Sequence, residues 1–285
     1  MFDFGMRNLA IFFKDKMTVL LSFLAEFIMV GLYLLFLRDN LLTSFPQLKN
    51  AKQLMDIWMI AGVLGVASAT TTMGAYGIMI DDKVKKINKD FYTAPVQKYK
   101  LLGGYLFSAV VIGLFMSLVI LMISELYVIN VYGIQLCGKR LMRILAILAL
   151  CTIANSSLVL FFVSFLKSNT SLAACCTIIG ALMGFLTGIY LPMGSLPESV
   201  QWIIKVFPVS HGVVLLRQEL MKDPILHSFG NASAGAQQFR EFMGVELLQD
   251  GKLMTATDSI VVLIVTAVVF GALTTINFFI QKRTK

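Results

Sequence analysis

The sequence predicts an all-α membrane protein: six transmembrane helices, with an N-terminal interfacial helix, a cytoplasmic coupling helix, and short re-entrant helices after the fifth span. Composition is the first observation behind this prediction. The 285-residue chain is 58% apolar and 14% charged, with a mean hydropathy of +0.81, whereas soluble domains average about 25% charged residues. The second observation is six apolar stretches near the roughly twenty residues that a helix needs to cross a bilayer. Backbone groups in lipid must bond internally, so each stretch is interpreted as a helix.

The first element is the segment "MFDFGMRNLAIFFKDK", residues 1–16. Its large apolar side chains recur at helical spacing, and most polar ones lie elsewhere: Phe2, Met6, Leu9 and Phe13 against Asp3, Arg7, Asn8 and Lys14. This pattern predicts an amphipathic helix lying in the cytoplasmic interface of the membrane. A disordered tail is the alternative.

The six spans are expected at 18–37, 57–80, 101–129, 144–166, 172–191 and 258–280 of a single transmembrane domain, 1–285. The first is longer than the apolar core of a signal peptide. With the N-terminus inside, the inner segments carry thirteen Lys and Arg residues and the two short outer loops carry six. This asymmetry favours both termini in the cytoplasm.

The polar segment "DDKVKKINKDFYTAPVQKYK", residues 81–100, follows the second span. Val84, Ile87 and Phe91 fall on one helical face, and its first four lysines occupy the others. The segment is interpreted as a short helix parallel to the membrane, and a loop held at lipid headgroups is the alternative. The aromatic pair Phe91 and Tyr92 favours a protein-docking surface, because such surfaces favour aromatic anchors.

The fifth span contains "GALMGFLTG", which places Gly180, Gly184 and Gly188 four residues apart. This spacing allows close helix packing, either within one chain or between two chains. The segment 192–257 comes next, with prolines at 192, 197 and 208. Two short helical pieces are expected there, Glu198–Phe207 and Val209–Met221, each too short to span and separated by proline. A more polar excursion, residues 223–257, follows them.

Several polar residues lie within apolar territory, chief among them Glu26 in the first span. Intramembrane acids usually face the bundle or a wet cavity. A translocation path lined by Glu26, Thr70, Thr71 and Asn155 is one interpretation. A protonated Glu26 bonded to neighbouring polar groups is the other.

Catalytic signatures are missing from the sequence: there is no GxxxxGK[ST] phosphate loop, GxSxG, HExxH or EF-hand pattern. Four cysteines without a CxxC pair and two distant histidines predict neither a disulfide framework nor a metal site. The net charge of +8 lies mostly beside apolar stretches, which favours lipid over nucleic acid as a partner. We therefore expect a chain that is not an enzyme and binds no cofactor itself.

Three stretches resemble landmarks of bacterial ABC-2-type exporter permeases. These are "RNLAIFFKDKMTVLLSFLAEFIMVGLYLLFL", "DKVKKINKDFYTAPVQKYKLLGGYLFSA" and "YLPMGSLPESVQWIIKVFPVSHGVVLLRQEL". They match, in order, the interfacial helix with the first span, the loop that meets the ATPase, and the stretch after the fifth span. The drug-resistance and sodium-efflux-like permeases are more similar than the glycan exporters.

This resemblance implies a subunit of the bacterial cytoplasmic membrane that works as a homodimer with two copies of a separate ATPase. ATP and magnesium would bind on that partner. The segment 81–100 would contact it through Val84, Lys85, Lys86, Ile87, Phe91 and Tyr92. The first and fifth spans would form the dimer seam. The expected function is ATP-driven export of a small amphiphile, drug or peptide, with export of a lipid-linked glycan or ion-gradient-driven transport as alternatives.

Overall fold

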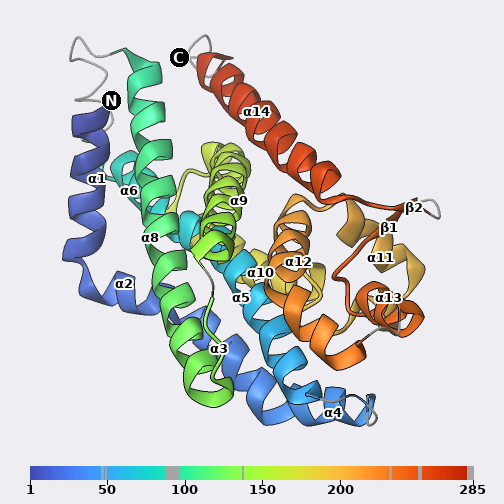
Figure 1. Cartoon of the computed structure of the whole chain (residues 1–285). Coiled ribbons are helices and arrows are strands. Elements are labelled where there is room, and N and C mark those ends of the chain that lie inside the picture. The colour runs from blue at the N-terminus through green and yellow to red at the C-terminus, as the bar shows by residue number, and fades with distance from the viewer. Residues whose placement is uncertain are drawn as a thin grey trace.

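The computed structural model describes residues 1–45, 48, 50–87, 97–136, 138–230, 233–249 and 252–280, which form a helical bundle (Figure 1). Within these ranges the only strands are β1 (Leu248–Gln249) and β2 (Lys252–Leu253), which pair antiparallel. Six helices there are long and apolar enough to cross a membrane. The predicted all-α membrane fold is therefore confirmed.

The six candidate spans are mostly longer than the sequence predicted. The first consists of α2 (Lys16–Ser22), α3 (Leu24–Leu32), the π-helical turn η1 (Tyr33–Leu37) and α4 (Arg38–Thr43), and the second of α5 (Ala51–Ala75) and α6 (Gly77–Val84). The others are α8 (Lys98–Tyr132), α9 (Gly138–Phe165), α10 (Asn169–Leu186) and α14 (Ala256–Ile280). Helices continue through polar end residues that hydropathy excludes. The start of α1 and the end of α14 lie at the same end of the bundle (Figure 1). We call this end the α1 end.

Helix α5 is the centre of the bundle, since 94% of its apolar stretch is buried, against 11% for α10 and 17% for the first span. It packs against α8, α9 and α12 (Pro208–Phe229). Gly65 permits the close approach of α12, because a Cβ there would overlap the side chain of Val213. Small residues at helix crossings let backbones come together in this way.

Helix α1 (Phe2–Lys14) confirms the helix predicted for the N-terminal segment, but its buried face differs from the predicted stripe. Gly5, Asn8 and Phe12 are buried, whereas Phe2 and Met6 are exposed. Rather than standing apart from the bundle, α1 runs alongside the first half of α8 (Figure 1). The 35 residues of α8 extend about 52 Å at 1.5 Å per residue. That length exceeds the roughly 30 Å hydrocarbon core. Part of α8 therefore extends beyond the core, and α1 covers it.

The region after α10 differs from the expected pair of short helices. Helix α11 (Glu198–Val206) is short, but α12 has 22 residues, continues through Pro224 to Phe229, and is bent 88° from α11. Pro208 begins α12 at a position where its missing N–H costs nothing. The predicted end at Met221 was wrong because α12 is buried against α5 and α9, and this packing maintains the helix. Helix α13 (Ser233–Phe242) and the β1–β2 hairpin complete the segment.

Candidate functional site

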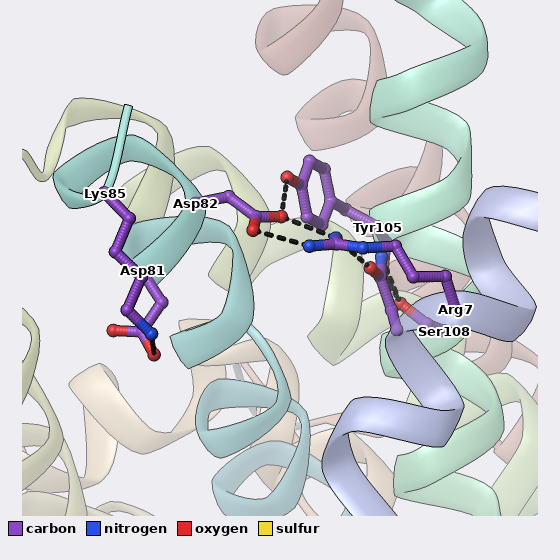
Figure 2. Close-up of polar contacts among 7 residues, drawn as sticks. Arg7, Asp81, Asp82, Lys85, Tyr105 and Ser108 are labelled. Atoms are coloured by element: carbon purple, nitrogen blue, oxygen red, sulfur yellow. Dashed lines mark hydrogen bonds and ion pairs between the residues drawn. The ribbon is translucent and has the colours of Figure 1, made fainter. Parts of the chain in front are cut away.

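An ion pair joins α1 to the end of α6 at the α1 end of the bundle (Figure 2). Both terminal nitrogens of Arg7 donate to Asp82, with Nη1–Oδ2 and Nη2–Oδ1 distances of 2.8 Å each. The hydroxyl of Tyr105 on α8 donates to Asp82 Oδ2 at 2.6 Å. Asp82 is buried, and its hydrogen bond raises the pKa of Arg7 above the ordinary value. One carboxylate therefore connects three helices.

The α1–α8 contact beside this ion pair is tight. Asn8 Nδ2 donates to Ser108 Oγ at 3.4 Å, and both residues are buried. Gly104 on α8 allows the approach, because a Cβ there would lie 2.6 Å from the Phe4 ring and 3.2 Å from the carbonyl oxygen of Met1. The ion pair is thus held in a packed helix interface.

The opposite side of α6 contacts two further helices. Lys83 Nζ donates to the carbonyl oxygens of Ser164 and Leu166 at 3.3 and 3.2 Å, at the end of α9. Asn169, the first residue of α10, donates to Asp81 Oδ1 at 2.7 Å. Lys85 also pairs with Asp81, and both turn away from Arg7 (Figure 2). We call Asp81, Asp82 and Lys83 with these partners the α6 junction. A displacement of the end of α6 would act on α1, α8, α9 and α10 together.

The residues predicted to contact an ATPase follow this junction directly. Val84, Lys85 and Lys86 are exposed, and Ile87 is half-buried. Lys86 has φ +62°, so the α6 helix does not continue through it. Phe91 and Tyr92 lie outside the described residues, and with them most of the predicted coupling helix.

The four residues of the predicted translocation path lie in two separate places. Thr70 donates to Glu26 Oε1 at 2.7 Å, on the side of α5 that meets α3. Asn155 on α9 donates to Ser68 at 2.8 Å. Positions 68 and 70 are about 200° apart around a helix, so these bonds lie on opposite sides of α5. Thr71 is buried and donates to the carbonyl oxygen of Ala67. The chain alone therefore does not gather these residues around one cavity.

A buried carboxylate that the sequence analysis did not single out, Asp56, lies near the start of α5. Its Oδ1 accepts from the Tyr33 hydroxyl at 2.9 Å. Its Oδ2 accepts from Arg38 and from the hydroxyls of Tyr127 and Tyr132, at 2.5, 2.7 and 2.6 Å. The π-helical turn makes this arrangement possible, because the Arg38 N–H bonds to the Tyr33 carbonyl oxygen five residues earlier. That bond brings Tyr33 and Arg38 to the same side of the helix, whereas they would lie about 140° apart around an α-helix.

A second buried charge, Arg217 on α12, is bound mainly by backbone oxygens. It donates to the carbonyls of Gly188, Met243 and Gly244 at 3.0, 3.4 and 3.2 Å, and lies over the Trp58 ring at 4.5 Å. Trp58 also donates to the Met243 carbonyl at 2.7 Å. Arg217 therefore fixes the segments that follow α10 and α13 to the centre of the bundle.

The predicted glycine ridge is shorter than the spacing indicated. Helix α10 ends at Leu186, and Gly188 occupies a turn with φ +64°. Gly184 packs within the chain, because a Cβ there would overlap the ring of Tyr190. A Cβ on Gly180 would meet nothing within 4 Å. A continuous three-glycine helical surface was therefore a wrong expectation, and only Gly180 leaves room for another chain.

The described residues contain no group of three or more His, Cys, Asp or Glu side chains placed to hold a metal ion.

The six membrane-length helices among the described residues define a multi-pass membrane protein. The chain belongs to the ABC-2 transporter family: the model of the family described as "ABC-2 family transporter protein" matches residues 42–276. No curated protein matches the chain. It is thus a permease component of an ABC transporter, and this family component is not itself an ATPase. Permeases of the family generally pair with an ABC ATPase subunit.

Proposed function

We propose that this chain is the permease subunit of an ATP-driven exporter of a small amphiphile, drug or peptide in the bacterial cytoplasmic membrane. The α6 junction is the observation that carries the proposal. The segment 81–100 begins there, and contacts from Asp81, Asp82 and Lys83 reach four other helices. A force applied to this segment would be shared by the bundle rather than absorbed by one loop.

The α1 end is assigned to the cytoplasm, with both termini on that side. The excess of Lys and Arg in the segments at this end supports the assignment. Two copies of a separate ATPase, which would bind ATP and magnesium, would contact Val84, Lys85, Lys86, Ile87, Phe91 and Tyr92. Closure of the ATPases would move α6, and its ion pair with Arg7 would carry α1 with it.

A second copy of this chain completes the transporter in this proposal. Few residues of the first span and α10 are buried within the chain, 17% and 11% of their apolar stretches. They are therefore the faces with most room for a partner, and Gly180 lies on α10. Of the residues predicted to line a path, Glu26 and Thr70 lie on the side of α5 that meets the first span, so a path beside the second copy would pass them. Thr71 and Asn155 are buried within the single chain. Nucleotide and substrate must each favour one of the two access states for transport to be coupled.

The test is co-expression with an ATPase encoded beside this chain, followed by reconstitution into liposomes. Amphiphiles and peptides would be screened for stimulation of ATP hydrolysis and for export. Phe91→Ala, Tyr92→Ala and the double change Lys85→Glu with Lys86→Glu should abolish export and substrate-stimulated hydrolysis while the chain still folds. Lys139→Glu, a charge reversal at an exposed lysine in the first turn of α9, is the matched control. Variants of segment 81–100 that retain full substrate-stimulated turnover would refute the docking assignment.

A further inference from the structure

An apolar groove runs between α3, α5 and α8, with a volume of about 160 Å³. Most of its lining is aliphatic or aromatic, including Val30, Leu34, Ile60, Val63 and Ile120. On the first span the lining extends from Phe23 to Leu34, which corresponds to about 16 Å along a helix. The groove is therefore long and narrow, and a cavity of about 150 Å³ accommodates one benzene ring.

The groove meets the membrane rather than water. Phe27, Leu34 and Ile123 line it and are 56%, 40% and 47% exposed. All three belong to membrane-length helices. Where the second copy does not cover them, large apolar side chains exposed at such positions face lipid tails. A ligand would enter sideways from the bilayer.

Two carboxyl groups line the groove, and they differ in how they are satisfied. Asp56 accepts hydrogen bonds from four side chains, one of them the cation of Arg38. Glu26 is 2% exposed, receives one bond from Thr70 on Oε1, and has no partner on Oε2. If Glu26 is ionised, its Oε2 lacks a hydrogen-bond donor. If Glu26 is protonated on Oε2, that hydroxyl lacks an acceptor. A buried polar atom without a partner is costly, and a ligand group is one way to satisfy it.

The charge of the lining favours one ligand chemistry. The lining contains two acids and no Lys, Arg or His, and Arg38 already pairs with one acid. An anionic ligand would bring a second negative charge beside Glu26 without compensation. A cationic amine would neutralise that carboxylate and donate an N–H to it, in a medium where a lone charge is expensive.

We infer that this groove binds a monoamine amphiphile: an elongated apolar body along α3 and α5, with an ammonium group donating to Glu26 Oε2. The inference rests on the proposed function, since it narrows the class of exported amphiphile. It assigns Glu26 a specificity role and does not need the second copy.

The test compares three probes of one shape: 4-phenylbutylamine, 4-phenylbutan-1-ol and 4-phenylbutanoate. Binding to the full-length chain would be measured by equilibrium dialysis in nanodiscs of zwitterionic lipid, with empty nanodiscs subtracted. The amine should bind at least tenfold more tightly than the alcohol, and the anion most weakly. Equal binding of amine and alcohol would overturn the inference.

Two variants separate charge from shape. Glu26→Gln keeps the side-chain volume and an oxygen that accepts from Thr70, and should bring the amine within threefold of the alcohol. Val30→Phe should fill the groove and weaken both probes by similar factors. Glu125→Gln is the control, because Glu125 accepts from the Leu136 N–H after α8 and does not line the groove. Unchanged amine preference in Glu26→Gln would refute the role of Glu26.

Failure of this inference is distinguishable from failure of the proposed function. The dialysis needs neither ATP nor an ATPase. If the amine preference is missing but the co-expressed complex exports another substrate, only the amine site is wrong. If the amine binds through Glu26 but no co-expressed ATPase drives export of the amine or of any other screened substrate, the groove stands and the exporter proposal fails.

Discussion

Arg7 and Asp82 form a two-bond ion pair across 75 positions of sequence, between the first helix of the chain and the end of the second span. The carboxylate is buried, and Tyr105 supplies a third bond to it. A fork-shaped pair of this kind fixes orientation as well as distance. The position of α1 is therefore coupled to that of α6.

The first prediction concerns this coupling. Arg7→Ala and Asp82→Ala should each reduce the hydrogen-exchange protection of α1 amides, and the double variant should be no worse than the worse single one. A double-mutant cycle should give an interaction energy of about 0.5–3 kcal/mol. Lys85→Ala is the control, since the exposed Lys85–Asp81 pair should contribute only a few tenths of a kcal/mol by the behaviour of surface i,i+4 pairs. Additive single effects would show that α1 docks independently of the ion pair.

The second prediction concerns Asp56. Asp56→Asn leaves Arg38 without its counter-charge, and breaking a buried ion pair from one side costs about 3–5 kcal/mol. Tyr132→Phe deletes a single hydrogen bond to the same carboxylate, which should cost about 1.5–3 kcal/mol. Both are measurable as shifts of thermal unfolding of the purified chain in detergent. A larger loss for Tyr132→Phe than for Asp56→Asn would contradict the assignment of Asp56 as the centre of the cluster.

The spans were predictable from sequence because burial in lipid needs only length and low polarity. Their ends were less so, since Asp56 and Tyr132 continue helices α5 and α8 beyond the apolar windows. Asp56 itself was missed for a physical reason. Its partners come from the first span and from α8, and only tertiary packing brings these helices to α5. The π-helical turn at Tyr33 has no pattern in the sequence.

In the candidate site too, composition was visible in the sequence, whereas contacts between helices were not. The Lys-dense segment after Ile80 was visible as composition, yet the contacts of Asp82 with Arg7 and Tyr105 depend on how α1 lies on α8. Glu26 was noticeable as a lone acid in an apolar stretch, but only the structure places Oε2 without a partner beside a groove. Glycine spacing predicted a ridge and could not indicate that α10 ends before Gly188.

The third prediction contrasts two glycines of α10. Gly184→Ala should destabilise the chain by about 1–3 kcal/mol, the usual cost of overpacking, because the new methyl would overlap the Tyr190 ring. Gly180→Ala should stabilise α10 by up to about 1 kcal/mol through helix propensity, since its methyl would meet nothing. Thermal unfolding measures both, and Tyr190→Ala should relieve the Gly184→Ala defect.

Gly180→Leu then tests the dimer seam. Loss of dimer in cross-linking, with unfolding temperature unchanged, would place Gly180 at the interface, whereas an intact dimer would exclude it.

The last prediction concerns Arg217, which donates to carbonyl groups from two turns while lying over Trp58. Lysine keeps the charge but offers a single ammonium point in place of a planar fork. Arg217→Lys should therefore lose at least one of these charged hydrogen bonds, worth about 1.5–3 kcal/mol, and lower the unfolding temperature. Hydrogen exchange should rise at Gly188 and Gly244, which the guanidinium holds. Arg240→Lys is the matched control, because Arg240 pairs with Glu246 at a half-exposed position where surface substitutions stay within about 0.5 kcal/mol. If both lysine variants unfold at the same temperature, the two turns are held by packing alone and the guanidinium is dispensable.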